Sequence, residues 1–372
     1  MIFMLTEINV TNYGAVGDGT TDRSAAIKAA VDQAGKESYG GLVLIPPGTY
    51  LVTSLRLHAH VKLSGTSSWS FRSGGGSTLK ANDDTCGCLL DTTEAYGCSI
   101  SGLCLDGAKQ GQEVNGIQFL REDFFDHKEE DTFTVEDCQI RNFTGAGLFL
   151  QYACCFSVRH SHIIDNDGDG IYLNSWDGFI LDNWLSSNGG WGIRSAADGV
   201  NNAAMTLTAN RVEWNKKGGF FIQNAKLWSL CGNFFDRCGG PAIHIAEGIE
   251  PTPEMDPRWI KLDSHTITVT GNIFHRNGAD FDNDLDEKDH SHIRMHSCSN
   301  VTITGNTMLQ GVGDDNGGKR SPEYGLVVEA LSGCTITGNT MWQGYTKRAI
   351  WDMGFHMQEV IMTQNSGISK PD

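Results

Sequence analysis

Two acidic residues occupy the same place in two similar segments of the chain. Glu213 lies in NRVEWN (210–215) and Asp236 lies in NFFDR (233–237), 23 residues further on. A pair of carboxyl groups, one protonated and one ionised, is what hydrolysis of a glycosidic bond requires. Close approach of like charges itself raises the pKa of one member. The pattern indicates a glycoside hydrolase with Glu213 and Asp236 as acid and nucleophile or base, in either order.

Aromatic and basic residues recur at neighbouring positions of the same pattern. An aromatic ring packs against the C–H face of a sugar, while charged groups bond its hydroxyls. The candidates to bind a polysaccharide or oligosaccharide are Tyr172, Trp184, Arg194, Arg211, Trp214, His244 and His275. The aromatic residues could instead cover a loop or a subunit contact. A non-catalytic carbohydrate-binding protein is therefore a further class of function to consider.

An acidic stretch offers a different chemistry. The run DNDGDG (165–170) matches the first half of a calcium loop, but the twelfth position is Trp176 rather than Glu, so an EF-hand is excluded. A simple turn is the favoured interpretation. A divalent-ion site remains an alternative for this run, and no other metal or cofactor is expected.

These residues can lie together only if the chain repeats. A four-residue unit begins at residues 137, 160, 182, 209 and 232, and it returns with Gly-Asn at 271, 305 and 338. Short strands opened by Gly, such as 147–150 and 170–173, lie between these units. A unit this short cannot bury its own apolar face, so it must stack on its neighbours. The pattern predicts an all-β fold, a parallel β-helix.

In a β-helix, equivalent residues of successive coils stack about 4.8 Å apart. The residue after each four-residue unit is expected to point outward, which places Glu213 and Asp236 in one surface column. His275 joins the column less securely, after an insertion. The residues expected to point inward are Ile140, Ile163, Leu185, Val212 and Phe235. A ladder of side-chain amides is expected to satisfy the turns, formed by Asn183, Asn210, Asn233, Asn272, Asn306 and Asn339.

The N-terminal region differs from the repeats. Residues 23–35 are rich in Ala and suit an amphipathic helix with Thr21 or Asp22 as its N-cap. Such a helix would cover the open end of the first coil, where strand edges would otherwise be exposed. The chain is predicted to be a single domain, residues 1–372, with a cap over 1–40, coils over 41–365 and an insertion near 246–296.

Three segments carry a family resemblance: NYGAVGDGTTD (12–22), GGLVLIPPGTYLV (40–52) and LCLDG (103–107). They resemble the pectate-lyase-like superfamily, which implies a right-handed parallel β-helix. That superfamily includes lyases, hydrolases, epimerases, fructotransferases and trimeric phage tailspikes, so the resemblance leaves the chemistry open. Its calcium lyases imply a second enzyme class, a polysaccharide lyase that acts by β-elimination, with Arg194 as base near a calcium ion bound by Asp165, Asp167 and Asp182. Its tailspikes imply a third class, a non-catalytic, homotrimeric carbohydrate-binding spike or adhesin. Residues 147–151 occupy the place of the Asp-Pro-His-Glu motif of alginate epimerases but do not match it. The motifs of the pectin hydrolases are also missing from the sequence. Epimerisation and galacturonan hydrolysis are therefore not expected.

The composition limits the classes of partner that the chain is expected to bind. The formal net charge is −17, which opposes binding to nucleic acid or to an anionic membrane surface. No run of about 18 apolar residues occurs, and the first residues lack the basic region of a signal peptide. The compartment stays open, since the chain could be a processed form. The 11 cysteines lack the paired CxxC spacing of a zinc site and are expected to be mostly buried apolar residues.

Overall fold

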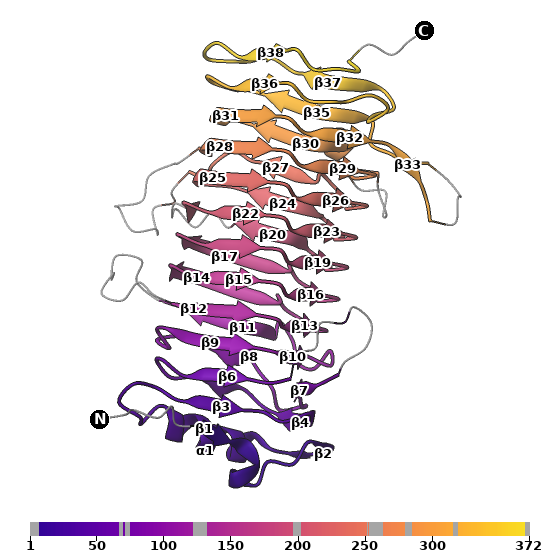
Figure 1. The fold of residues 1–372 in the computed structure, drawn as a ribbon. Helices are drawn as coiled ribbons and strands as arrows, with labels where there is room; N and C mark the ends of the chain where they lie inside the picture. The colour runs from indigo at the N-terminus through magenta and orange to yellow at the C-terminus, as the bar shows by residue number, and fades with distance from the viewer. Residues whose placement is uncertain are drawn as a thin grey trace. The chain divides into compact units, whose positions relative to one another are not determined.

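The computed structural model describes residues 7–66, 70, 75–121, 132–195, 202–250, 252, 263–279, 285–314 and 319–368. Within each of the chain's two compact units, short parallel strands stack in successive coils (Figure 1). The chain divides into two compact units. Unit 1 comprises Met1–Tyr172 and Asp177–Trp184, and unit 2 comprises Leu173–Trp176 and Leu185–Asp372. No helix of the described residues is long and apolar enough to span a membrane.

Unit 1 carries the N-terminal cap and the first coils. The cap comprises η1 (Val10–Tyr13) and α1 (Ser24–Ala34). One series of strands is β1 (Glu7–Asn9), β3 (Leu42–Leu44), β5 (Leu55–Arg56), β6 (Lys62–Ser64), β8 (Cys88–Asp91), β9 (Cys98–Ser101), β11 (Asn115–Leu120), β12 (Phe133–Glu136), β14 (Leu148–Cys154), β15 (Ser157–Arg159), β17 (Ile171–Trp176) and β18 (Phe179–Leu181). The other series is β2 (Asp18–Asp22), β4 (Gly48–Val52), β7 (Ser77–Ala81), β10 (Leu103–Asp106), β13 (Gln139–Arg141), β16 (His162–Ile164) and β19 (Trp184–Ser186). Strands β17 and β19 each have residues in both units.

Unit 2 continues the same architecture. Its larger series is β20 (Trp191–Ser195), β21 (Asn202–Ala203), β22 (Thr206–Thr208), β24 (Gly218–Ile222), β25 (Ala225–Cys231), β27 (Ile243–Ile245), β28 (His265–Thr270), β30 (Ser291–His296), β31 (Ser299–Thr304), β35 (Tyr324–Glu329), β36 (Thr335–Thr337), β37 (Arg348–Asp352) and β38 (Ile361–Thr363). The second series is β23 (Arg211–Glu213), β26 (Phe234–Asp236), β29 (Ile273–His275) and β32 (Thr307–Leu309). The remaining elements are η2 (Glu287–Asp289) and an antiparallel hairpin, β33 (Gly311–Val312) with β34 (Lys319–Arg320). The predicted insertion near 246–296 lies partly outside the described residues.

The predicted capping helix is confirmed as α1. Its apolar stripe, Ile27, Ala30, Val31 and Ala34, is buried over the first coil. The N-cap residue is Arg23, whose side chain makes no capping hydrogen bond, so the prediction of Thr21 or Asp22 as N-cap is wrong. Asp22 still accepts a hydrogen bond of 2.7 Å from the amide of Ser24, which satisfies one of the orphan amides at the helix start.

The core of each unit consists of the predicted inward side chains. Ile140 and Ile163 of unit 1, like Val212 and Phe235 of unit 2, have no exposed area. Phe235 stacks on Phe274 of the next coil at 5.1 Å between ring centroids, with the rings almost parallel. Such a pair contributes about 0.5–1.5 kcal/mol beyond its area burial. The periodic apolar residues therefore hold neighbouring coils in register.

The asparagine ladder is also confirmed. In unit 2, Asn233 Oδ1 accepts hydrogen bonds of 3.0 Å from the backbone amide and the side-chain amide of Asn210. Asn233 Nδ2 donates to the Leu207 carbonyl and to Asn272 Oδ1, both at 3.0 Å. The ladder extends one residue beyond the predicted set, because Asn339 donates in the same way to Asn365. Each buried turn amide thereby finds an acceptor.

Removing one interior step of the ladder should destabilise unit 2. Asn233→Ala leaves the buried amide of Asn210 without its acceptor, and an unsatisfied buried group costs about 1–3 kcal/mol. We expect a loss on this order in urea unfolding. Asn365→Ala is the matched variant, because Asn365 is only half-buried and ends the ladder. Equal losses for the two variants would contradict a stabilising role for the interior step.

A fully buried histidine should make stability depend on pH. Burial, with the charge of His275, lowers the pKa of His292 from 6.5 to about 3. A depressed pKa means that this contribution to stability is complete above about pH 6.5 and is lost as the pH falls below it. The free energy of unfolding is expected to fall by about 1.4 kcal/mol for each pH unit in this range. His292→Asn should flatten the decline in the free energy of unfolding between about pH 6.5 and 5, measured by urea titration. An unchanged slope would refute this.

Candidate active site

Three outward positions of unit 2 lie in one column. Glu213 pairs with Asp236 in the neighbouring strand, and Asp236 pairs with His275 in the next. The strands β23, β26 and β29 are three residues long, so the central residue points inward and its neighbours point outward. Strand spacing places successive members of the column about 4.8 Å apart at their backbones. The predicted alignment of Glu213, Asp236 and His275 is therefore present.

The expected exposure of the two carboxyl groups is wrong. Glu213 is 4% exposed and Asp236 is 2% exposed, although both leave the coil on its outer side. Neighbouring side chains cover them, chiefly arginines, which are long enough to lie along the outer face of the sheet. The sequence pattern predicts which way a strand residue points, but it does not predict what lies on top of it.

Asp236 is held as an anion. Arg276 binds it in a bidentate manner, with Nε 2.8 Å from Oδ1 and Nη2 2.6 Å from Oδ2. Arg237 Nη2 lies 2.8 Å from Oδ2, and His275 Nδ1 lies 3.2 Å from Oδ1. Burial on its own raises the pKa of Asp236, but the hydrogen bonds from His275 and Arg276 and the charge of Arg237 outweigh burial, so the pKa is lowered. Asp236 is therefore ionised at neutral pH.

The two arginines reach outward to a third acidic residue. Arg276 Nη1 lies 2.9 Å from Asp314 Oδ1 and donates a hydrogen bond of 2.9 Å to the Val312 carbonyl. Arg237 also pairs with Asp314, which is 59% exposed at its side chain. The hydrogen bond from Arg276 lowers the pKa of Asp314. A chain of alternating charges thus leads from buried Asp236 to the surface near β33.

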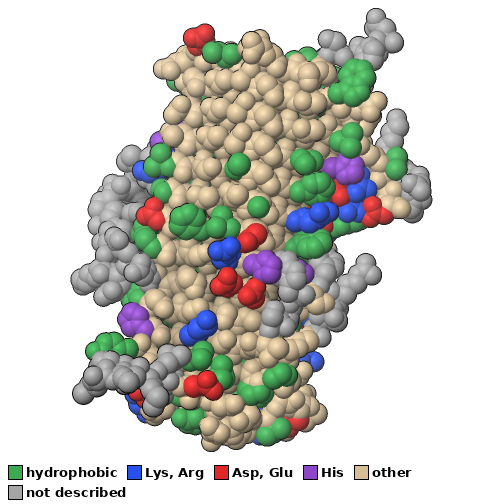
Figure 2. Space-filling model, viewed as in Figure 1, with side chains coloured by type: hydrophobic (Ala, Val, Ile, Leu, Met, Phe, Trp, Pro, Cys, Tyr) green, Lys and Arg blue, Asp and Glu red, His purple; other side chains and the backbone are tan. Residues whose placement is uncertain are grey.

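A glycine brings β33 close to the column. A Cβ atom on Gly311 would lie 2.6 Å from His275 Nε2 and 2.8 Å from Arg276 Cδ. Any side chain at this position would therefore force the histidine or the arginine to move. Figure 2 shows basic, acidic and histidine side chains gathered on the face over β26 and β29, beside the hairpin.

Sequence reasoning missed Arg237, Arg276 and Asp314. A signal for the arginines was present, because Arg237 directly follows Asp236 and Arg276 directly follows His275 in the same repeat position. Trp214 has that position after Glu213, and the Arg237 guanidinium carbon lies 3.8 Å from the centre of its ring. Asp314 lies on a loop outside the repeat, so no periodic signal identifies it.

Arg211 lies at the exposed edge of the site. Its Nε lies 2.7 Å from Glu213 Oε1, and its guanidinium carbon lies 4.5 Å from the centre of the Phe234 ring. The Arg211 side chain is 47% exposed, while that of Glu213 is 5% exposed. Arg211 and Trp214, with His275, are the predicted sugar-binding residues that the structure brings to the Glu213 column.

The other predicted sugar-binding residues lie elsewhere. Arg194 and His244 flank Phe221 in a column on the other sheet of unit 2. Burial, with the charges of Arg294 and His296, lowers the pKa of His244 to about 3. In unit 1, Tyr172 stacks on Phe149 at 4.6 Å and Trp184 meets His162 edge-on at 5.5 Å. Arg194 and His244 therefore lie on a different sheet from the Glu213 column, and their role in sugar binding stays a prediction.

The acidic stretch in unit 1 is neutralised by a lysine. Lys109 Nζ donates to the Asp165 carbonyl at 2.6 Å and to Asp167 Oδ1 at 2.7 Å. Asp182 instead accepts a 2.9 Å hydrogen bond from the amide of His160. The carboxylates of Asp167 and Asp182 thus have different partners, and the Lys109 ammonium group lies beside Asp167.

A second charged cluster lies in unit 1 and was not predicted. Arg159 lies between Glu136, at 3.9 Å, and Asp182, at 3.3 Å. His160 pairs with Asp137 on the adjacent turn. These side chains are 38–53% exposed, unlike the carboxyl groups of the Glu213 column. This exposed cluster is the alternative candidate for an active site. Its residues serve as controls for substitutions in the Glu213 column.

Comparison with known proteins now gives the family. The model of the family described as rhamnogalacturonase A/epimerase, pectate lyase-like matches residues 7–244. A second model, right handed beta helix region, matches residues 193–357. The chain belongs to this pectate lyase-like family, and its fold is the predicted right-handed parallel β-helix.

Individual relatives agree with this assignment. The chain is 27% identical over 195 residues to mannuronan C5-epimerase AlgE1 of Azotobacter vinelandii, a match that spans 49% of this chain and 14% of that protein. Two solved structures share the fold. The mannuronan C-5 epimerase AlgE4 A-module of the same organism has a TM-score of 0.64 at 18% identity, covering 97% of this chain and 96% of that one. DFA-IIIase of Arthrobacter chlorophenolicus A6 has a TM-score of 0.63 at 17% identity, covering 90% and 84%.

Proposed function

We propose that the protein hydrolyses a glycosidic bond of a polysaccharide or oligosaccharide at the Glu213 column of unit 2. The observation that carries this proposal is the pairing of two carboxyl groups in adjacent strands, one of them ionised by its surroundings. The family and its relatives support carbohydrate as the substrate class, since the relatives named above act on mannuronan or were solved in complex with a fructan-type ligand, GF2.

The environment of Asp236 supports a division of the two roles. A general acid must hold its proton at the working pH, and a lowered pKa disfavours that role for Asp236. We propose Asp236 as the ionised member, which stabilises positive charge on the sugar or acts as nucleophile or base, and Glu213 as the proton donor to the leaving oxygen.

Sugar would enter from the exposed edge of the site. Arg211 and Trp214 are proposed to contact it, because Arg211 is half-exposed and Trp214 lies beside Glu213 in the chain. His275, whose side chain is 24% exposed, is proposed to bond a hydroxyl group. Arg276 is bonded to both oxygens of Asp236, so access of a sugar to Asp236 requires Arg276 to move, and Arg276 is also paired with Asp314 beside β33.

A reducing-end assay over a panel of neutral and acidic polysaccharides tests the proposal. New reducing ends from the wild-type protein are the expected result. A glycan screen that shows binding without any product would instead favour a non-catalytic carbohydrate-binding protein. The predicted homotrimer stays a prediction, to be measured by sedimentation of the same sample.

A β-eliminating lyase is the second candidate. Matches to mannuronan C5-epimerases and to alginate lyase 7 of Azotobacter vinelandii, the latter 28% identical over 196 residues, favour it. Epimerases and lyases remove a proton next to a carboxylate, a step for which the Asp236–His275 pair and its arginines offer a base and cations. An unsaturated product that absorbs in the near ultraviolet would support the lyase and contradict hydrolysis.

A further inference from the structure

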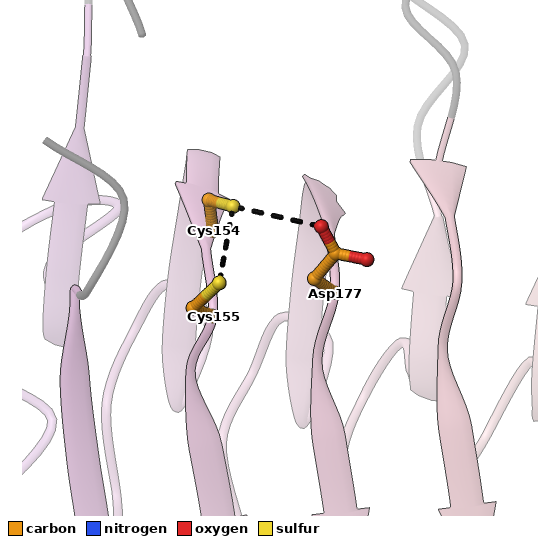
Figure 3. Close-up of side chains that lie close together, drawn as sticks. All are labelled: Cys154, Cys155 and Asp177. Atoms are coloured by element: carbon orange, nitrogen blue, oxygen red, sulfur yellow. Dashed lines mark hydrogen bonds between the residues drawn. The ribbon is translucent and has the colours of Figure 1, made fainter. Parts of the chain in front are cut away.

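Two adjacent cysteines and an aspartate converge at one corner of unit 1. Cys154 ends β14, Cys155 follows it, and Asp177 lies 22 residues further along. In an extended strand, successive side chains point to opposite faces. Cys155 breaks this alternation because its φ is +52°, in the left-handed region. Asp177 has the same φ of +52° in its own turn. The two turns therefore direct the two thiols and the carboxylate toward one another (Figure 3).

The spacing of the three groups matches the coordination sphere of a zinc-like ion. Cys154 Sγ lies 3.6 Å from Cys155 Sγ and 3.8 Å from Asp177 Oδ2. With Zn–S bonds of about 2.3 Å and Zn–O bonds of about 2.0–2.2 Å, tetrahedral angles place two sulfurs about 3.8 Å apart and sulfur and oxygen about 3.6 Å apart. All three ligand atoms lie within 4.8 Å of one another. One ion can therefore contact all three with little rearrangement.

We propose that Cys154, Cys155 and Asp177 bind a thiophilic divalent cation of the Zn²⁺ class, with water completing a tetrahedron. Each thiol that becomes a ligand releases its proton to solvent. Two thiolates and one carboxylate are a donor set that prefers zinc or cadmium to magnesium or calcium. This site does not depend on the proposed glycosidase activity.

The surroundings make the site rigid on one side and open on the other. The Cys154 carbonyl accepts hydrogen bonds from the backbone amide and the hydroxyl of Thr132, at 3.2 and 2.8 Å. Cys154 is buried, whereas Cys155 and Asp177 are exposed, so an ion can enter from solvent. By contrast, burial raises the pKa of Cys88 and Cys98 to about 12, as befits cysteines that only fill space.

Metal binding to the reduced full-length chain tests the site. After treatment with a thiol-free reductant, with free thiols counted, the protein is titrated with Zn²⁺ in competition with a chromogenic chelator. Native mass spectrometry gives the stoichiometry. One Zn²⁺ per chain is expected. Cys155→Ser and Asp177→Asn should each weaken the affinity at least roughly tenfold, the scale of metal-site perturbations. Co²⁺ should give the intense visible bands of a tetrahedral thiolate site.

Cys86→Ser is the matched control, because Cys86 is also an exposed cysteine of unit 1 but has no place in the cluster. It should leave the Zn²⁺ affinity unchanged. The proposal is overturned if fully reduced protein binds no stoichiometric Zn²⁺, or if Cys155→Ser and Asp177→Asn bind as tightly as the wild type. Binding lost only in Cys86→Ser would overturn it equally. Glycan cleavage is measured in parallel and is expected to be the same for Cys155→Ser and the wild type.

Discussion

Glu213→Gln is expected to lower kcat/KM for glycan cleavage by at least about a hundredfold, because an amide cannot donate the proton that the leaving oxygen needs. General acid catalysis contributes about 10²–10⁴-fold. The substitution keeps the size of the side chain and one acceptor for Arg211 Nε, which lies 2.7 Å away, so the fold should be retained. Initial rates of reducing-end release, at matched protein concentration and with circular dichroism of both proteins, measure the effect.

Glu136→Gln is the control for this experiment. Glu136 belongs to the charged cluster of unit 1, where its side chain is 53% exposed and 3.9 Å from Arg159. The proposed mechanism gives it no role, so its variant should retain wild-type kcat/KM. A large loss in Glu136→Gln together with an active Glu213→Gln would move the active site to unit 1 and refute the assignment.

Asp236→Asn is expected to destabilise the protein by about 3–5 kcal/mol, the cost of removing one partner from a buried ion pair. The loss is large because Arg276 and Arg237, whose side chains are each only 10% exposed, would keep their charges without the anion between them. Urea unfolding followed by fluorescence at neutral pH measures it. Activity of this variant must be assayed at a temperature where it stays folded, and it should fall there as well.

Asp314→Asn is the matched variant for stability. Asp314 pairs with the same two arginines, but its side chain is 59% exposed and water can replace it. We expect a much smaller loss than for Asp236→Asn. If the two variants are equally stable, Asp236 does not anchor the arginines, and its ionisation could no longer be used to assign Glu213 as the acid.

Periodicity accounts for what could be predicted. Inward Phe235, the ladder residue Asn233 and the pairing of Glu213 with Asp236 all follow from one rule, that residues a coil apart become neighbours. The rule rests on backbone geometry and on the need to bury apolar faces, which a single sequence displays directly. The capping helix α1 could be predicted from a different periodicity, because its apolar residues recur at helical spacing.

Burial of the candidate site could not be predicted in this way. Asp236 is covered by Arg276, which lies 40 residues away in the chain, and the Arg237–Asp314 pair spans 77 residues. The repeat places Arg237 and Arg276 beside the column but does not show that their side chains fold over it, and Asp314 lies on a loop whose path the repeat does not determine.

The mass balance of the reaction distinguishes hydrolysis from elimination and from epimerisation. A defined oligosaccharide that the enzyme cleaves is digested in ¹⁸O-labelled water, and the products are weighed by mass spectrometry. Hydrolysis at Glu213 and Asp236 predicts products that together gain one molecule of labelled water, and this gain should disappear in Glu213→Gln. Cleavage without added water would show that the protein is a lyase, and conversion of the sugar without cleavage would show that it is an epimerase. Either result would contradict the proposed hydrolysis.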